Sequence, residues 1–197
     1  GLRGAAHARN FALSFARGRF IAFLDCDDLW LNTKLEKSIF YLENNNLAFT
    51  WSGYNVINGE GETVRTQRIK GVATLFDVFS KKEVIGCLTV IYDAVKIGKI
   101  EMPAIKMRND YALWFKILSL CEKNNLKYGG LPDILASYRL HASSLSNKKV
   151  TAALYQWILY RQHAGLSIPR SAYFMIHYFI NGMSDRLIGG GPKTSGS

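Results

Sequence analysis

The stretch Phe20-Ile21-Ala22-Phe23-Leu24-Asp25-Cys26-Asp27-Asp28-Leu29-Trp30 decides the fold of this chain. It begins with an unbroken apolar run that includes aromatic and β-branched side chains, which is typical of a strand buried in a mainly parallel sheet. A cluster of carboxylates follows directly, and the chain then returns to Leu29 and Trp30. In open α/β sheets, the carboxyl ends of the strands form the edge at which ligands bind. The stretch therefore predicts an α/β fold with a ligand site where this strand ends.

The carboxylates Asp25, Asp27 and Asp28 predict a cation site. Carboxylates crowded at a buried strand end repel one another and lose solvation, so they need a compensating positive charge. A hard divalent ion, Mg²⁺ or Mn²⁺, suits oxygen ligands and can bridge to the phosphates of a nucleotide. The alternative is that Asp27 or Asp28 caps the helix expected from Leu31. Since one helix does not need three caps, we favour the interpretation of a metal and diphosphate site.

Composition and charge exclude several classes of protein. The 197 residues are 48% hydrophobic, which indicates a folded domain and not a disordered chain. The net charge of +10 favours anionic partners, but no basic run or motif indicates a nucleic-acid partner. The 3 cysteines match neither a disulfide framework nor a zinc site, which favours a reducing cytoplasm. We expect no signal peptide, and no apolar run has the length of a membrane span.

Apolar spacing predicts the other elements of the chain. Residues 5–17 and 31–44 have the spacing of amphipathic helices, and Lys34 is expected on the polar face of the second. Residues 47–57 and 63–70 read as two strands joined by a tight turn. We further expect a short helix at residues 74–79, a buried strand at 86–92, a strand entered near 124–128, a loop at 129–132 and a strand at 134–139.

A second candidate centre lies at Met107-Arg108-Asn109-Asp110-Tyr111. Apolar residues follow Asp110 at helical spacing, so Asp110 is expected at or near the N-terminus of a helix. A carboxylate is also favoured at that position for structural reasons, because it caps the helix and complements its dipole. Spacing alone leaves open whether Asp110 has a structural or a chemical role.

The C-terminal part is expected to form a helical hairpin from residues 150–165 and 171–187, rich in aromatic and basic side chains. In one interpretation, this hairpin packs on the preceding domain. In the other, its Trp and Tyr rings lie at the headgroup level of a membrane with Arg and Lys beside them. We favour the membrane surface. Residues 189–197 are expected to form a flexible tail without chemistry.

Several separate motifs occur in one order between about residues 4 and 146. They are Gly4-Ala5-Ala6-His7-Ala8-Arg9-Asn10, residues 16–30, Lys34-Leu35-Glu36, residues 107–114 and residues 138–146. This series resembles family 2 glycosyltransferases of the GT-A fold, which carry the pattern "ARN…A.G.yi.fLD.DD.w". The pattern contains a DxD motif, here Asp25-Cys26-Asp27, whose carboxylates hold a metal and a sugar nucleotide in that family.

The resemblance implies roles for residues of the first motifs. Arg9 would lie near the donor diphosphate; the alternative is an exposed cation on a helix. Asp27, with Asp25 and Asp28 close by, would hold Mg²⁺ or Mn²⁺. Asp25 could instead contact the ribose of the donor.

The resemblance also assigns the later motifs. Asp110 would be the catalytic base, as the second acid of the family's "ED" pair. Because Asn109 replaces the first acid, acceptor positioning or pKa tuning is expected to differ. Arg139, His141 and Ser146 would approach the donor diphosphate, with His141 contacting phosphate or metal. The alternative for His141 is a hydrogen-bonded structural residue.

We therefore predict an α/β fold, with a GT-A-like nucleotide-diphospho-sugar transferase sheet flanked by helices over residues 1–147. A C-terminal helical hairpin would span residues 148–188, before the tail. The resemblance implies a metal-dependent, inverting hexosyl transfer from a nucleotide-diphosphate sugar, expected to be a UDP-sugar. The acceptor would be a hydroxyl of a glycan or lipid-linked molecule in bacterial surface glycan synthesis. The expected location is the cytoplasm, peripheral at the inner face of the cell membrane.

Two other interpretations remain open. The resemblance implies that the first strands and helices of the family domain, which hold much of the base and ribose site, precede the part seen here. The chain could therefore be a catalytically inactive GT-A remnant that still folds or binds a partner. It could also be a basic peripheral module that binds membranes or nucleic acid, in which the acidic cluster only caps a helix.

Overall fold

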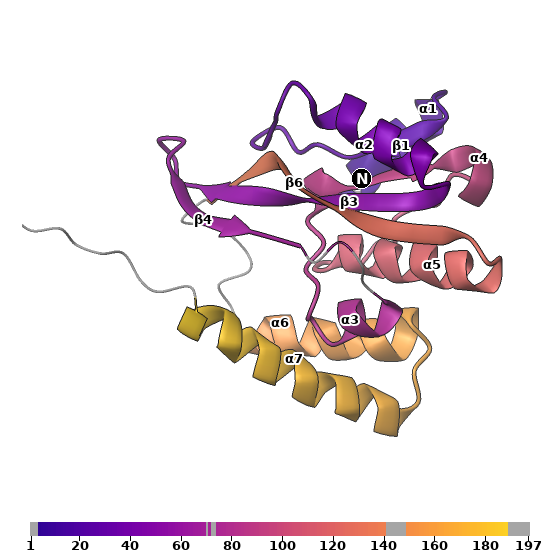
Figure 1. The fold of residues 1–197 in the computed structure, drawn as a ribbon. Helices are drawn as coiled ribbons and strands as arrows, with labels where there is room; N and C mark the ends of the chain where they lie inside the picture. The colour runs from indigo at the N-terminus through magenta and orange to yellow at the C-terminus, as the bar shows by residue number, and fades with distance from the viewer. Residues whose placement is uncertain (1–3, 70, 72–73, 141–148, 189–197) are drawn as a thin grey trace, which may run out of the picture.

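The computed structural model describes residues 4–69, 71, 74–140 and 149–188, and it has the layered architecture of an α/β fold (Figure 1). The predicted C-terminal tail lies outside the described residues. In chain order the elements are α1 (Ala5–Phe15), β1 (Phe20–Ala22), β2 (Leu29–Trp30), α2 (Lys34–Asn44), β3 (Leu47–Ile57), β4 (Thr63–Gln67), α3 (Leu75–Phe79), the 3₁₀ turn η1 (Cys87–Thr89), β5 (Ile91–Asp93), α4 (Ala94–Ile97), α5 (Asn109–Lys123), β6 (Lys127–Arg139), α6 (Lys149–Ile158), the π-helical turn η3 (Leu159–His163) and α7 (Ile168–Ile188).

The strands that the structure describes form a mixed six-stranded sheet. The strand order is β1-β5-β3-β6-β2, and β4 pairs with the outer part of β3. Among the strand pairs of the described residues, β3 and β6 alone are parallel, whereas the other pairs are antiparallel. The prediction of a mainly parallel sheet was therefore wrong. A continuous apolar run reports that a strand is buried on both faces, and it carries no information on the direction of its neighbours.

Strand β1 distributes its side chains between the two faces of the sheet. Ile21 joins the main core cluster, which the apolar face of α5 completes, while Phe20 and Ala22 pack with Leu42 of α2. Helices α2 and α5 lie on opposite sides of the sheet (Figure 1). The apolar run at the start of the deciding stretch is thus explained by burial on both faces, although the strand itself is short.

Strand β6 runs straight through the Gly-Gly-Leu-Pro segment that was expected to be a loop. The glycines allow this, because a Cβ atom at Gly130 would lie 2.5 Å from Ile69 Cδ1 and 3.0 Å from Trp51 Nε1. The register between β3 and β6 shifts next to Gly53, which accommodates the irregular segment. The buried strand expected at residues 86–92 is also different, because it divides into η1 and the short β5.

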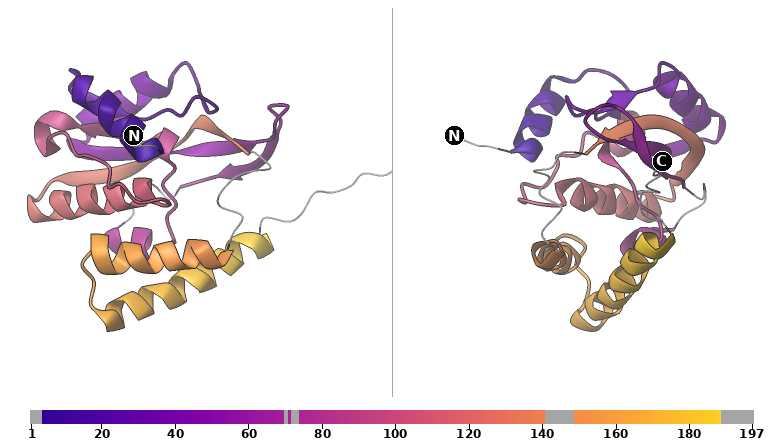
Figure 2. Two further views of the ribbon diagram at one scale, coloured as in Figure 1. Left: turned by 180° about the vertical axis from the view of Figure 1, so that it is seen from behind. Right: turned by 90° about the vertical axis from the view of Figure 1, so that its left-hand side faces the viewer.

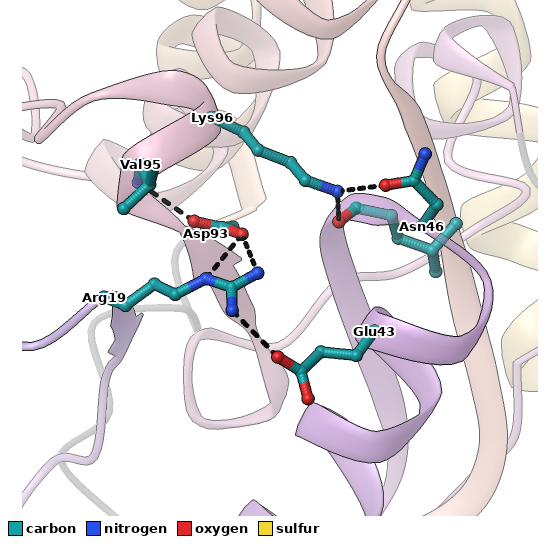
Figure 3. A network of polar contacts seen from close by, with 7 residues as sticks. Arg19, Glu43, Asn46, Asp93, Val95 and Lys96 are labelled. Carbon is teal, nitrogen blue, oxygen red and sulfur yellow. Dashed lines mark hydrogen bonds and ion pairs between the residues drawn. The ribbon is translucent and has the colours of Figure 1, made fainter.

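A polar network ties the start of β1 to β5 and α2 (Figure 3). Arg19 Nε and Nη2 donate to Oδ2 of the buried Asp93 at 3.0 and 2.8 Å, and Arg19 Nη1 donates to Glu43 Oε1 at 2.9 Å. Lys96 Nζ donates to Asn46 Oδ1 at 2.6 Å and to a backbone carbonyl at the start of β3. These contacts hold the edge strand β1, which ends where the carboxylate cluster begins.

Helices α6 and α7 fold back on each other on the side of α5 that faces away from the sheet (Figures 1 and 2). Their aromatic side chains Tyr160 and Phe174 belong to the main core cluster, together with Phe79 of α3 and Phe115 of α5. The ring centroids of Phe79 and Phe115 are 4.3 Å apart, and those of Phe79 and Phe174 are 5.1 Å apart. The hairpin therefore shares a core with α3 and α5.

No helix in the described part of the chain combines the length and hydropathy that crossing a membrane requires.

Candidate active site

A cavity of about 670 Å³ opens between the end of β1, the η1 turn, the start of α5 and the middle of α7. It collects side chains from segments that are far apart in the sequence, and it brings two of the predicted motifs together. The lining residues with charged or tyrosine side chains are Arg9, Asp25, Asp28, Tyr54, Lys81, Lys106, Arg108, Asp110, Tyr111, Tyr138 and Tyr178.

Arg9 of α1 bridges the two predicted motifs. Its Nη2 donates to both carboxylate oxygens of Asp25, at 2.7 and 2.5 Å, and its Nη1 lies 3.4 Å from Asn109 Oδ1. Only 14% of the Arg9 side chain is exposed, so the alternative of an exposed helix cation was wrong. The bridge fixes the loop after β1 against the first residue of α5.

Asp28 is buried, and its Oδ1 accepts the backbone N–H of Arg139 at 3.0 Å. Burial raises the pKa of the Asp28 carboxyl to about 6; the Arg139 N–H opposes this shift, and the negative charges of Asp27 and Asp25 add to it. Helix α2 begins at Lys34 after Thr33. Neither Asp27 nor Asp28 therefore caps it, and the capping alternative was wrong.

The three carboxylates do not form a closed metal cage. Within the described ranges, no group of three or more His, Cys, Asp or Glu side chains is placed to hold a metal, and Asp25 is already paired with Arg9. Mg²⁺ commonly takes one or two carboxylates and completes its shell with water and substrate phosphates. The repulsion that helps to raise the pKa of Asp28 would also be relieved by a nearby cation. The donor set thus fits an ion shared with a bound diphosphate.

Asp110 lies in the first turn of α5 and lines the cavity, so the prediction of a helix N-terminus is confirmed. Its Oδ1 accepts the N–H of Tyr111 at 2.8 Å. Burial raises the pKa of the Asp110 carboxyl, and that N–H together with the positive charges of Arg9 and Arg108 opposes the shift. A carboxylate with a raised pKa is a stronger base. The position therefore suits a base, and this role stays a prediction.

The Arg139 side chain makes hydrogen bonds to backbone carbonyls of other segments and so has a structural role here. Its Nε donates to the carbonyl of Asp27 at 3.1 Å, and its Nη1 donates to the carbonyls of Asn58 and Gly59 at 3.1 and 2.9 Å. These contacts join the end of β6, the carboxylate loop and the turn after β3. His141 and Ser146 lie outside the described residues. Donor contacts by Arg139, His141 and Ser146 stay predictions.

Lys34 was wrongly expected on the polar face of α2. It is fully buried, and its Nζ donates to the carbonyl of Thr89 at 2.6 Å and to Ser38 Oγ at 3.1 Å. Trp30 Nε1 donates to the neighbouring carbonyl of Leu88 at 2.7 Å. Trp30 and Lys34 thus hold η1, which forms one wall of the cavity. Because Trp30 ends β2 and Lys34 begins α2, no single periodicity in the sequence relates the two side chains.

Sequence reasoning also missed the contribution of α7 and of the segment before η1. Tyr178, Phe179 and Lys81 all line the cavity. The Tyr178 hydroxyl accepts a hydrogen bond from Arg108 Nη2 at 2.6 Å, which links α7 to the start of α5. The aromatic and basic composition of the C-terminal part was a signal for binding, but it did not indicate which residues would face the site.

Comparison with known sequences places these features in a family. The model of "Glycosyl transferase family 2" matches residues 2–96. A Bacillus subtilis (strain 168) protein, TuaG, named as a candidate teichuronic acid biosynthesis glycosyltransferase, is 38% identical over 184 residues, which cover 93% of this chain and 71% of TuaG. Escherichia coli WfgD, named as a UDP-Glc:alpha-D-GlcNAc-diphosphoundecaprenol beta-1,3-glucosyltransferase, is 35% identical over 92% of this chain and 69% of its own length.

Comparison with solved structures supports the fold. The S. aureus TarS 1–349 structure in complex with UDP-GlcNAc superposes with a TM-score of 0.60 at 17% sequence identity. The match covers 92% of this chain and 53% of the TarS chain, so this chain spans about half the length of that structure. A second TarS structure, in complex with UDP, superposes with a TM-score of 0.56. The expectation of a GT-A-like sheet flanked by helices, with helices at the C-terminal end, is confirmed.

Proposed function

Because the chain belongs to glycosyl transferase family 2, we propose that it transfers a sugar from a nucleotide-diphosphate donor to a hydroxyl acceptor in bacterial surface glycan synthesis. The observation that supports this most directly is the Arg9 bridge, which keeps the carboxylate loop and the start of α5 on one cavity. The donor side and the base of a sugar transfer must meet in this way, because the reacting atoms have to lie next to each other.

The proposed donor is a UDP-sugar. WfgD is named for the use of UDP-Glc, and the TarS structures contain UDP-GlcNAc or UDP. We place its diphosphate beside Asp25, Asp27 and Asp28, with a Mg²⁺ or Mn²⁺ ion shared between Asp27 and the phosphates. When bound, that ion would neutralise charge on the leaving diphosphate. Arg9 keeps Asp25 in position, and Asp25 could also contact the ribose.

Asp110 is the proposed base of an inverting displacement. The acceptor oxygen would form its bond to the anomeric carbon as the bond from that carbon to the diphosphate oxygen breaks, and Asp110 would take the hydroxyl proton. A base must lie within hydrogen-bond reach of that proton, and the proposal is supported by Asp110 lining the cavity in which the acceptor would bind. Burial raises the pKa of Asp110 and so increases its proton affinity, while the positive charges of Arg9 and Arg108 oppose this shift.

The proposed location is the inner face of the cell membrane, with the hairpin of residues 148–188 at the lipid surface. The observation that favours it is the outward face of α7, on which Tyr173, Ile176, Phe179 and Ile180 are about half exposed. Such a stripe with basic residues such as Arg170 nearby suits the interface of an anionic membrane. A lipid-linked acceptor, as in the name of WfgD, would be reached from there.

Calorimetric titration of UDP and of GDP tests the donor site. We expect UDP to bind with Mn²⁺ and not with EDTA, and we expect Asp27→Ala to lose this binding. Asp133→Ala is the matched control, since Asp133 is a partly exposed carboxylate that is paired with Lys37 and lies outside the carboxylate loop. UDP binding that survives both EDTA and Asp27→Ala would contradict the metal site.

The same titration separates the other interpretations. Absence of UDP and GDP binding under every condition would contradict the transferase proposal and favour an inactive remnant. Salt-dependent binding to anionic vesicles that survives Asp27→Ala, without any nucleotide binding, would favour a peripheral membrane module.

A further inference from the structure

We propose that Lys81 and Arg108, with Lys106 beside them, bind the phosphate or diphosphate group of a lipid-linked acceptor. The inference rests on the proposed function, because it assigns the acceptor side of the same cavity. All three cations line this cavity, as does Asp110. None of them belongs to the carboxylate loop on which the donor diphosphate was placed.

The position of the proposed base, Asp110, indicates that these cations meet the acceptor rather than the donor. A catalytic base has to face the acceptor hydroxyl, so groups beside the base lie beside the acceptor. Lys106 and Arg108 belong to the segment that leads directly into Asp110. The remaining arginine of the cavity, Arg9, is neutralised by Asp25 and belongs to the donor side. The cations near Asp110 are therefore placed to meet a negative charge carried by the acceptor.

Arg108 is held in a geometry that leaves a donor available. Its backbone is left-handed, with φ of 61°, which a residue other than glycine rarely adopts and which is found preferentially at functional sites. Its guanidinium lies 5.2 Å from the ring centroid of Tyr178 and 5.8 Å from that of Tyr111, and Nη2 donates to the Tyr178 hydroxyl. Its Nε is buried, and among the described residues it has no hydrogen-bond partner. A planar guanidinium fixed in this way suits phosphate oxygens.

Lys81 lies over the same ring, that of Tyr178. Its Nζ lies 5.2 Å from the ring centroid of Tyr178, and its backbone is also left-handed, with φ of 59°. Two cationic groups held on one tyrosine ring form a concentrated positive charge at the cavity wall. An anion that contacts both gains more than one that contacts either alone, which favours a phosphate or diphosphate over a single neutral hydroxyl.

The apolar surface next to these cations suits the lipid part of such an acceptor. Phe179 follows Tyr178 and lines the cavity, yet half of its side chain is exposed. Tyr173, Ile176 and Ile180 continue this exposed stripe at helical spacing along α7. The stripe is thus continuous with the cavity, and a hydrocarbon chain attached to a phosphate at Arg108 can leave along it.

Titration of geranyl diphosphate and inorganic pyrophosphate in EDTA tests the site without support from a divalent ion. We expect the wild-type protein to bind geranyl diphosphate. We expect the double variant, Lys81→Gln with Arg108→Gln, to bind it about tenfold or more weakly. Arg108→Lys, which retains the charge, should recover part of the loss. Lys82→Gln is the matched control, because Lys82 lies over the ring of Phe76 and does not line the cavity.

UDP titrated with Mn²⁺ into the same variants decides between acceptor and donor. We expect the double variant to bind UDP within about twofold of the wild type, because neither residue belongs to the carboxylate loop to which the donor is assigned. Parallel loss of UDP and geranyl diphosphate would overturn the inference and assign these cations to the donor. Unchanged geranyl diphosphate binding in the double variant, or none in the wild type, would also overturn it.

The comparison of the two probes tests the apolar stripe. We expect pyrophosphate to bind about tenfold more weakly than geranyl diphosphate, and Phe179→Ser to reduce this difference. Equal binding of both probes would overturn the role of α7. If UDP failed to bind the wild type, the proposed function would fail, and the geranyl diphosphate result would still decide on the anion site.

Discussion

The acidic and the basic parts of the cavity are built in opposite ways. Asp25 and Asp28 come from one short stretch, and the protein itself supplies their partners, Arg9 and the Arg139 N–H. The basic part joins Lys81, Arg108 and α7, which are far apart in the sequence, and Arg108 donates to the neutral hydroxyl of Tyr178 where Arg9 donates to a carboxylate. An arginine paired with a carboxylate holds its geometry before a ligand arrives, whereas an arginine bonded to a neutral hydroxyl keeps its net charge for an anionic ligand. Under the proposed function, the acidic part would be the donor side, with its geometry fixed in advance, and the Arg108 charge would remain for the acceptor.

The largest expected effect concerns Asp110, the proposed base between the donor and the acceptor. Asp110→Asn should reduce sugar transfer about 1000-fold, because general-base catalysis contributes a factor of this order. UDP binding with Mn²⁺ should stay unchanged. The measurement is the release of UDP from UDP-glucose and UDP-GlcNAc in the presence of bacterial lipid extract. Transfer that persists at more than a tenth of the wild-type rate would exclude Asp110 as the base. The assignment of the two parts to donor and acceptor would then lose its basis.

A second prediction contrasts the two arginines of the cavity. Arg9→Met should lower the free energy of unfolding by about 2 kcal/mol, since it leaves Asp25 without its charged hydrogen-bond partner. Arg108→Met should cost only about 1 kcal/mol, because Arg108 Nη2 donates to the neutral hydroxyl of Tyr178. Urea unfolding followed by circular dichroism provides both values. An equal or larger loss of unfolding free energy for Arg108→Met would mean that the protein satisfies the Arg108 charge as fully as it satisfies the Arg9 charge.

A third prediction concerns Lys34, whose contact holds the η1 wall between the two parts. Burial lowers the pKa of Lys34 from 10.5 to about 7 in the folded protein. Between these pH values the unfolded chain binds more protons than the folded one, so the Lys34 contribution to stability rises with pH. We expect the wild type to gain up to about 1 kcal/mol per pH unit over Lys34→Met from pH 7 to 9.

Urea unfolding of both proteins at pH 7, 8 and 9 measures that difference. The Lys34→Met variant removes the titrating group at nearly constant volume, so titration of other groups cancels in the comparison. A difference that does not change with pH would show that the Lys34 ammonium is solvated and that η1 is held by Trp30 alone.

The smallest expected effect concerns an ion pair outside the cavity, which serves as a reference for the pairs inside it. Lys37 Nζ and Asp133 Oδ2 form an ion pair of 2.7 Å, and both side chains are well exposed. Lys37→Ala should change the free energy of unfolding by about 0.5 kcal/mol or less, because solvent screens such pairs. A loss as large as that of Arg9→Met would show that partial burial does not distinguish the cavity pairs from surface pairs.

Some features followed from the sequence because their causes are local. The aromatic and β-branched side chains of residues 47–57 predicted β3 with its observed bounds, and the apolar spacing after Asp110 predicted the start of α5. The carboxylates after Leu24 marked the site, since acidic side chains at a strand end need a compensating charge whatever the fold around them. Motifs in a constant order indicated the family.

Other features were decided only by the tertiary structure. An apolar pattern reports burial, so it could not give the antiparallel neighbours of β1 and β5. Helical spacing placed Lys34 on a polar face, but η1 covers that face and supplies a carbonyl for its ammonium. The convergence of Lys81, Arg108 and Tyr178 depends on how α7 packs against α6 and α3. Contacts between distant segments are set by long-range packing, and no local pattern encodes them.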